Sequence, residues 1–186
     1  MEKIFSEELR IERLQSDHDR EGFSSYEKEL VKFLQEDALQ NQEKRISVTY
    51  LCFKKITNEL LGYITLLNDK INLQGDLELY FKDKGILYKS LPALKIGRLA
   101  VDDKFLKRGI GTALIAFAIK VADAIFQKHS GCRFLTLDAK RNKEKTKDSL
   151  DFYKKLGFCV FKESKETTPM YLDLSSLPQT SSDVPS

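Results

Sequence analysis

The sequence predicts an α/β domain in which helices flank a largely antiparallel, twisted sheet. Strand-like runs and amphipathic runs follow each other in the order strand, helix, hairpin, strand, helix, strand, helix, strand, strand. The length of 186 residues and the apolar content of 41% fit a single core. We therefore expect one domain over 1–175. The tail over 176–186 is polar and contains prolines, so we expect it to be disordered.

The first third of the chain predicts a strand, a helix and a β-hairpin. The run "LRIERL" over 9–14 alternates apolar and charged residues, which indicates a strand. The run "SSYEKELVKFLQEDALQNQ" carries an apolar stripe at helical spacing, with Ser24 or Ser25 as its N-cap. The runs "ISVTYLCFKK" and "LLGYITLL" are rich in residues that favour strands, and the short "ITNE" between them favours a hairpin.

The pattern over 68–94 is the weakest in the chain. We interpret "DLELYF" as the extension of a strand and "KDKGILYKSLP" as an irregular connection that ends at Pro92. The run "ALKIGRLAV" then predicts a strand, and a helix follows from Gly109 to about Lys128. The last third predicts a strand at "CRFLTLDA", a helix at "DSLDFYKKLGF" that ends at Gly157, and two strands at "FCVFKE" and "MYLDL".

Composition narrows the class of protein. The net charge of +3 and the pI of about 8.6 permit an anionic partner without requiring one. No signal-peptide pattern is visible and no apolar run approaches the roughly 20 residues of a membrane span, so we expect a cytoplasmic protein with no membrane partner. Three cysteines, Cys52, Cys132 and Cys159, are scattered along the chain, which argues against disulfides and against a metal site.

Two glycines, Gly109 and Gly111, stand at the start of the most regular predicted helix. A helix N-terminus carries unpaired N–H groups and a partial positive charge, and glycine lets a ligand approach the backbone closely. The run "KRGIGT" therefore predicts a phosphate cradle in which Lys107 and Arg108 supply charge. The N–H donors would be those of Gly109, Ile110, Gly111 and Thr112. An ordinary strand-to-helix turn that needs glycine for its geometry is the alternative.

Two other phosphate motifs are excluded at this position. The Walker motif requires Gly-Lys-Ser/Thr, which does not follow. The dinucleotide fingerprint requires a third glycine at fixed spacing, which is missing.

Taken together, "IGRLAV", "KRGIGTAL", the long helix, the next strand and "FYKKLGF" resemble the GNAT N-acetyltransferase superfamily. The family's cofactor signature is Arg/Gln-x-x-Gly-x-Gly/Ala at a helix start. Here Leu106 departs from the usual first residue, while the glycines are kept. The second hallmark, Phe-Tyr-x-x-Leu-Gly-Phe, is intact over 152–158. The resemblance covers roughly 9–175.

The resemblance implies acetyl-CoA as co-substrate and a sheet splayed at the acetyl-CoA site. It implies that the pyrophosphate lies on the amides of the cradle. It places pantetheine and thioester against the main chain of Leu99, Ala100 and Val101. It also implies that Tyr153 protonates the departing thiolate. The alternative for Tyr153 is a packed aromatic residue on an amphipathic helix.

The sequence does not place a general base. Many members of the family carry a glutamate on the strand before the cradle, and "LKIGRLAV" has none. Glu78 is a candidate by default, and Asp102 is better placed to serve a turn. His18 and His129 are expected at the surface. Because no nucleophile triad is visible, we expect direct transfer rather than an acyl-enzyme.

A closer resemblance concerns the acceptor amine. The runs "GFSSYEKELVKFLQEDALQNQ" and "IGRLAVDDKFLKRGIGTAL" resemble the acetyltransferase toxins of bacterial toxin–antitoxin pairs, with Ser24 where a cysteine is typical. This implies acetylation of the amino group of aminoacyl-tRNA, an antitoxin partner and a homodimer. A free α-amino group has a pKa near ~8, so part of it is neutral at pH 7 without a strong base, whereas a lysine near ~10.4 needs one.

Basic residues late in the chain are the candidates for contact with phosphates. They are Lys140, Arg141, Lys143, Lys145, Lys147, Lys154 and Lys155. A solvated loop and helix face is the alternative. Two further functions stay open: acetylation of a small-molecule or protein amine, and a non-catalytic acyl-CoA-binding protein on the same fold.

Overall fold

The computed structural model describes residues 2–140, 149–162 and 166–178. Within them, seven strands form one sheet in the order β1-β2-β3-β4-β5-β7-β6. Only β4 and β5 run parallel, and the other neighbours are antiparallel. The strands are β1 (Leu9–Arg13), β2 (Val48–Lys54), β3 (Leu60–Asn72), β4 (Ser90–Val101), β5 (Phe134–Lys140), β6 (Cys159–Val160) and β7 (Thr167–Asp173). The predicted fold class is confirmed.

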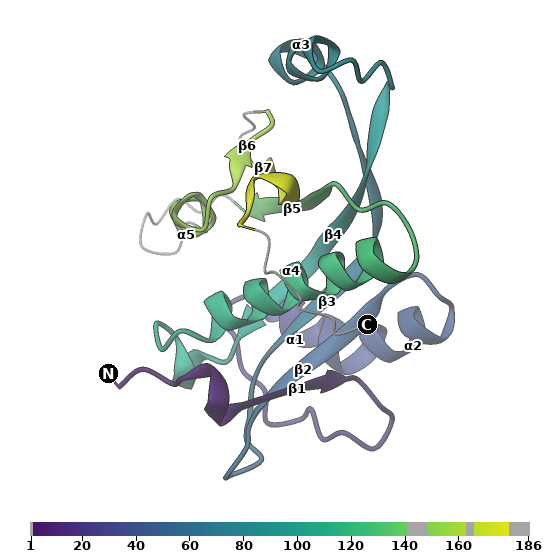
Figure 1. Ribbon diagram of the computed structural model, residues 1–186. Coiled ribbons are helices and arrows are strands. Elements are labelled where there is room, and N and C mark those ends of the chain that lie inside the picture. Colours follow the sequence, from purple (N-terminus) through teal and green to yellow (C-terminus); the bar gives the residue numbers. More distant parts are fainter. Residues whose placement is uncertain (1, 141–148, 163–165, 179–186) are drawn as a thin grey trace, which may run out of the picture.

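Helices flank the sheet. In Figure 1, α4 crosses in front of the strands, while α1 and α2 lie behind them. The helices are α1 (Lys28–Lys32), a π-turn (Phe33–Asp37), α2 (Ala38–Glu43), α3 (Gly75–Asp83), α4 (Ile110–Lys128) and α5 (Leu150–Lys155). Short 3-10 turns cover Ser6–Glu8, Asp103–Phe105 and Leu174–Ser176.

The two faces of the sheet have separate cores because successive residues of a strand point to opposite sides. Leu51 of β2 packs with Leu34 on the side of α1 and α2. Its neighbour Cys52 packs with Leu114 of α4 on the other side.

The helix predicted from Ser24 begins later, at α1. The N–H of Ser24 donates to Asp102 Oδ2 at 2.7 Å, and the N–H of Tyr26 donates to Asp103 Oδ1 at 3.1 Å. These bonds hold 24–26 against the end of β4, so that the segment cannot join the helix. Between α1 and α2 the helix widens into the π-turn, a feature that an apolar stripe does not reveal.

The interpretation of "DLELYF" as a strand is wrong, because this run lies in α3. Leu77 and Phe81 are one helical turn apart and pack against Phe134, with the rings of Phe81 and Phe134 5.9 Å apart. The connection also ends earlier than predicted. Pro92 lies inside β4, opposite Lys70 of β3.

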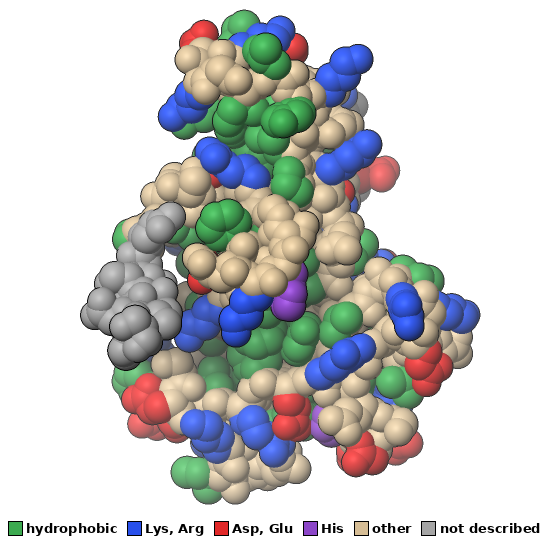
Figure 2. All heavy atoms as spheres, turned by 45° about the vertical axis from the view of Figure 1, so that its right-hand side comes forward, with side chains coloured by type: hydrophobic (Ala, Val, Ile, Leu, Met, Phe, Trp, Pro, Cys, Tyr) green, Lys and Arg blue, Asp and Glu red, His purple; other side chains and the backbone are tan. Residues whose placement is uncertain are grey.

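Helix α3 stands at the far end of an arm formed by the long strands β3 and β4 (Figure 1). Figure 2 shows hydrophobic side chains gathered at this end of the molecule. Four large apolar or aromatic side chains of this region are exposed: Leu79, Tyr80, Leu87 and Tyr88. A group of exposed apolar side chains is typical of an interaction surface.

The remaining predicted elements are present, although β6 is only two residues long. One described helix, α4, has the length and apolar composition of a membrane span, contrary to the expectation that no apolar run approaches that length. Its residues Leu114, Ala118 and Ala122 are fully buried and belong to the core that the helix shares with the sheet. The end of the predicted tail, 179–186, lies outside the described residues.

Candidate active site

The candidate active site lies where β4 and β5 part. The two strands pair only over 93–96 of β4 and 134–137 of β5. The next residue of β4, Gly97, is skipped in the register against β3 and forms a bulge. A cavity of about 1400 Å³ lies between the diverging ends and is lined by residues of both strands. The predicted splay of the sheet is therefore present.

The loop from β4 into α4 contains two residues with left-handed backbone. Lys107 has a φ of 60° and Gly109 a φ of 93°. Glycine adopts this conformation without the cost of a β-carbon. The first α4 hydrogen bond runs from Ala113 N–H to Gly109 O at 3.0 Å, so the N–H groups of 110–112 have no acceptor within the helix. These three residues line the cavity at the positive end of the helix dipole.

Gly111 lies against the ring of Phe152, which begins the second motif. A β-carbon at Gly111 would stand 3.1 Å from Phe152 Cζ, closer than an ordinary contact. The structure thus explains why glycine stands at both positions: Gly109 adopts a left-handed backbone, and Gly111 leaves room for the ring of Phe152. The turn geometry and an anion cradle are compatible, because neither reason uses the N–H groups of 110–112.

The N-terminal segment packs beside this loop. Ile4 N–H donates to Arg108 O at 3.0 Å, and Arg108 Nε donates to Glu2 O at 2.9 Å. The guanidinium of Arg108 also lies over the ring of Phe105, 5.5 Å from its centre. The side chain of Arg108 is thus bound to Glu2 and Phe105. Lys3 lies next to Gly109 and lines the cavity, although no sequence pattern connects it to the loop.

The other nine predicted site residues all line the cavity. They are Leu99, Ala100, Val101, Lys107, Gly109, Ile110, Gly111, Thr112 and Tyr153. The structure therefore brings Tyr153 together with the strand end and the loop, although it stands far from both in the sequence. Arg108 is the one predicted residue that is not among the lining residues.

Two roles were considered for Tyr153 from the sequence, a proton donor in the site and a packed aromatic residue, and its position is compatible with both. Its ring packs against Phe152 and Phe158, with ring centres 5.0 and 5.7 Å away, and only 8% of the residue is exposed. It nevertheless lines the cavity. Burial raises the pKa of the Tyr153 hydroxyl above its usual value, and electrostatic interactions with Tyr26 and Glu27 raise it further. The hydroxyl therefore keeps its proton at neutral pH.

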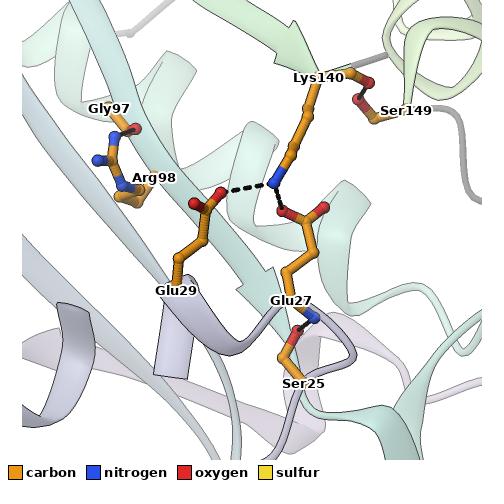
Figure 3. A network of polar contacts seen from close by, with 7 residues as sticks. All are labelled: Ser25, Glu27, Glu29, Gly97, Arg98, Lys140 and Ser149. Atoms are coloured by element: carbon orange, nitrogen blue, oxygen red, sulfur yellow. Dashed lines mark hydrogen bonds and ion pairs between the residues drawn. The ribbon is translucent and has the colours of Figure 1, made fainter. Parts of the chain in front are cut away.

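A polar network that the sequence did not suggest lies on the α1 side of the cavity (Figure 3). Lys140 Nζ, at the end of β5, lies 2.7 Å from Glu27 Oε2 and 2.6 Å from Glu29 Oε1. The N–H of Glu27 donates to Ser25 Oγ, and Ser149 Oγ donates to the Lys140 carbonyl. The hydrogen bond from Lys140 lowers the pKa of Glu29, and the two carboxylates raise the pKa of Lys140.

The base candidates named from the sequence lie elsewhere. Glu78 pairs with Lys82 on α3 at 2.7 Å, outside the cavity. The carboxylate of Asp102 accepts from Ser24 and from the N–H of Lys104, so it serves the turn as expected. His18 is held between Gln15 N–H and Glu12. His129 follows the last residue of α4 and is exposed.

The basic run is only partly described. Residues 141–148, which contain Arg141, Lys143, Lys145 and Lys147, lie outside the described residues. Lys154 and Lys155 are exposed on α5. Lys140 is engaged with the two carboxylates and is not available to a phosphate in this arrangement.

Comparison with known proteins agrees with this geometry. The model of the Acetyltransferase (GNAT) family matches residues 9–158. The fold is similar to that of AtaT complexed with acetyl-methionyl-tRNAfMet (TM-score 0.75, 25% identity, 90% of this chain and 96% of that chain). It is similar to a Tyr→Phe variant of KacT (TM-score 0.72, 27% identity, 91% of this chain and 96% of that chain). It is also similar to a Tyr→Phe variant of the AtaT toxin bound to acetyl-CoA and the C-terminus of the antitoxin AtaR (TM-score 0.68, 25% identity, 91% of this chain and 95% of that chain).

Proposed function

The chain belongs to the GNAT acetyltransferase family, and from this premise we propose that it acetylates the amino group of aminoacyl-tRNA, as a toxin of a toxin–antitoxin pair. The enzyme is an N-acetyltransferase that uses acetyl-CoA as co-substrate. The observation that carries the proposed acceptor is the similarity, over 90% of this chain, to AtaT complexed with acetyl-methionyl-tRNAfMet.

The residues of the cavity fit acetyl-CoA. The N–H groups of 110–112, with the ammonium groups of Lys3 and Lys107, suit a pyrophosphate. The free edge of β4 over 99–101 offers main-chain groups to the amides of pantetheine and to the thioester carbonyl. The gap between β4 and β5 is open along this edge, so an extended chain can lie between the strands.

Tyr153 acts as general acid in this proposal. Acetyl transfer requires a donor for the developing oxyanion and a proton for the departing sulfur. Main-chain N–H groups of β4 polarise the thioester carbonyl. The hydroxyl of Tyr153, which burial keeps protonated, gives its proton to the thiolate. The acceptor nitrogen attacks the carbonyl directly.

The proposed protein partners are an antitoxin and a second copy of the chain. The exposed apolar end of the arm, which carries Leu79 and Leu87, is a surface that suits contact with another protein. The similar AtaT variant is bound to the C-terminus of its antitoxin. We place the enzyme in the cytoplasm, where aminoacyl-tRNA and acetyl-CoA are found together.

The acceptor is tested with labelled acetyl-CoA and purified enzyme. Charged tRNA should be labelled and uncharged tRNA should not. Cell-free translation should stop only when both enzyme and acetyl-CoA are added, and Tyr153→Phe serves as the matched control. Labelling of polyamines or peptides in place of charged tRNA would instead assign a small-molecule or protein amine. Binding of acetyl-CoA without transfer to any of these acceptors would indicate a non-catalytic protein.

A further inference from the structure

We infer that Glu27 and Glu29 form the subsite that receives the ammonium group of the acceptor, that Glu27 takes a proton from it, and that Lys140 fills this subsite until the acceptor displaces it. The inference rests on the proposed transfer to a primary amine. It supplies the base that the sequence left open.

The carboxylates already hold a primary ammonium ion. Lys140 Nζ makes contacts of 2.7 and 2.6 Å with Glu27 and Glu29 inside the wall of the cavity (Figure 3). A primary ammonium has three N–H donors, and the two carboxylates accept two of them. The side chain of Glu27 is 16% exposed, whereas that of Glu29 is 67% exposed. Glu27 is therefore the inner of the two groups.

A second observation comes from Tyr153. Its residue is more than nine-tenths buried and lines the same cavity, and its hydroxyl has no hydrogen-bond partner among the described residues. Glu27 also lines this cavity. The hydroxyl opens into the cavity rather than being sealed in the core, so a ligand there can form a hydrogen bond with it. The space bounded by Tyr153 and Glu27 is thus suited to a polar ligand.

The two substrates then approach from opposite faces of the sheet. The proposed phosphate groups lie at the start of α4, on one face, and Glu27 precedes α1, on the other. The gap between β4 and β5 joins the two sides. An amine held at Glu27 faces a thioester that is held along β4.

The protons balance as follows. The acceptor binds as R–NH₃⁺, and Glu27 takes one proton to give R–NH₂. The nitrogen forms a bond with the thioester carbon, and the carbon–sulfur bond breaks. The sulfur takes a proton from Tyr153, and the second proton of the nitrogen restores Tyr153. The products are R–NH–CO–CH₃ and CoA–SH, and Glu27 releases its proton to water.

Lys140 is a competitor for the subsite in this inference. Its ammonium must leave the carboxylates before the acceptor enters, and its flexible stem allows this. If the ion pair were purely structural, replacing Lys140 or replacing Glu27 would remove the same contact, and both changes would affect acceptor binding in the same direction. Variants of the two sides therefore have effects of opposite sign on acceptor binding only if the inference is right.

The test compares Glu27→Gln, Glu29→Gln and Lys140→Met, with whichever amine the wild-type enzyme acetylates among charged tRNA, a polyamine and a peptide. Glu27→Gln should raise the KM for the acceptor about tenfold or more, because a charged partner is lost. Its kcat/KM profile should move to higher pH, because the amine must then lose its proton in solution. Glu29→Gln, the matched control on the exposed side, should have a smaller effect. Lys140→Met should lower the acceptor KM.

The Kd for acetyl-CoA and the melting temperature are measured for all three variants and should stay near wild type. An unchanged acceptor KM and pH profile in Glu27→Gln would overturn the inference, and so would a higher acceptor KM in Lys140→Met. These outcomes are separate from the identity of the acceptor. If the wild-type enzyme acetylates a polyamine or peptide but not charged tRNA, the proposed acceptor is wrong while the subsite is still tested.

Discussion

The ring of Phe152 packs against Gly111, so that the two motifs of the family are in direct contact. We expect Gly111→Ala to lower the free energy of unfolding by about 1–3 kcal/mol, because the new β-carbon crowds Phe152 Cζ. Thermal melting measures this effect. Phe152→Leu in the same chain should recover part of the loss, because the two residues touch. Strict additivity of the two substitutions would show that Gly111 is needed for another reason.

Lys3 should contribute to the binding of acetyl-CoA, although no motif contains it. Its side chain lines the cavity beside Gly109, and an ammonium group paired with a phosphate is worth about 1.5–3 kcal/mol. Lys3→Ala should therefore weaken binding about tenfold or more in calorimetry, and the loss should shrink at high salt. Arg108→Ala is the matched control. Its guanidinium is turned to Glu2 and Phe105, so a larger effect at Arg108 than at Lys3 would contradict this assignment.

Tyr153→Phe should lower kcat by about 10²–10⁴-fold, because it removes a general acid but keeps the ring. The Kd for acetyl-CoA and the melting temperature should stay near wild type, since the ring keeps its packing against Phe152 and Phe158. A loss of less than about threefold would leave Tyr153 as a packing residue.

The pH profile of the wild-type enzyme gives an independent check on Tyr153. Burial raises the pKa of its hydroxyl, so the acid form persists to higher pH than for an ordinary tyrosine, whose pKa is about 10. The alkaline limb of kcat should accordingly lie above about pH 10. An alkaline limb near neutral pH that disappears in Tyr153→Phe would contradict the direction of this shift.

Two glycines beside the cavity should differ in their tolerance of a methyl group. At Gly62 a β-carbon would stand 2.6 Å from the carbonyl oxygen of Ala100, which is backbone and cannot move without displacing β4. At Gly97 it would stand 2.8 Å from Cδ2 of Leu67, the end of a flexible side chain. Gly62→Ala should therefore lower the melting temperature more than Gly97→Ala and should also weaken acetyl-CoA binding. Equal losses would mean that Leu67 has no room to move.

The sequence predicted most of the sheet because its strands follow local patterns. The alternation in "LRIERL" and the hairpin around "ITNE" depend only on neighbouring residues. Helix α3 was missed because its helical form depends on packing of Phe81 against Phe134, a residue far along the chain. The late start of α1 has a similar cause, since Asp102 and Asp103 hold the preceding segment.

The residues of the candidate site also fall into those that a local sequence motif predicts and those that only the fold brings together. Nine of the ten predicted residues line the cavity, because they belong to two motifs whose spacing can be read directly. Glu27, Glu29 and Lys140 could not be predicted, because Glu27 and Lys140 stand 113 residues apart and have no shared motif. Their contact arises because the fold brings the start of α1 to the end of β5, which the apolar stripe of the helix does not indicate.

The parting of β4 and β5 also bears on how the protein avoids aggregation. An unpaired strand edge is a template for another chain, and sheets normally keep such edges short, charged or covered. Here two edges lie in the middle of the sheet, one along 97–101 of β4 and one along 138–140 of β5. Both edges contribute residues to the wall of the cavity. The enzyme thus places these two unpaired edges in the wall of the site that an extended co-substrate would occupy, rather than at the outer border of the sheet.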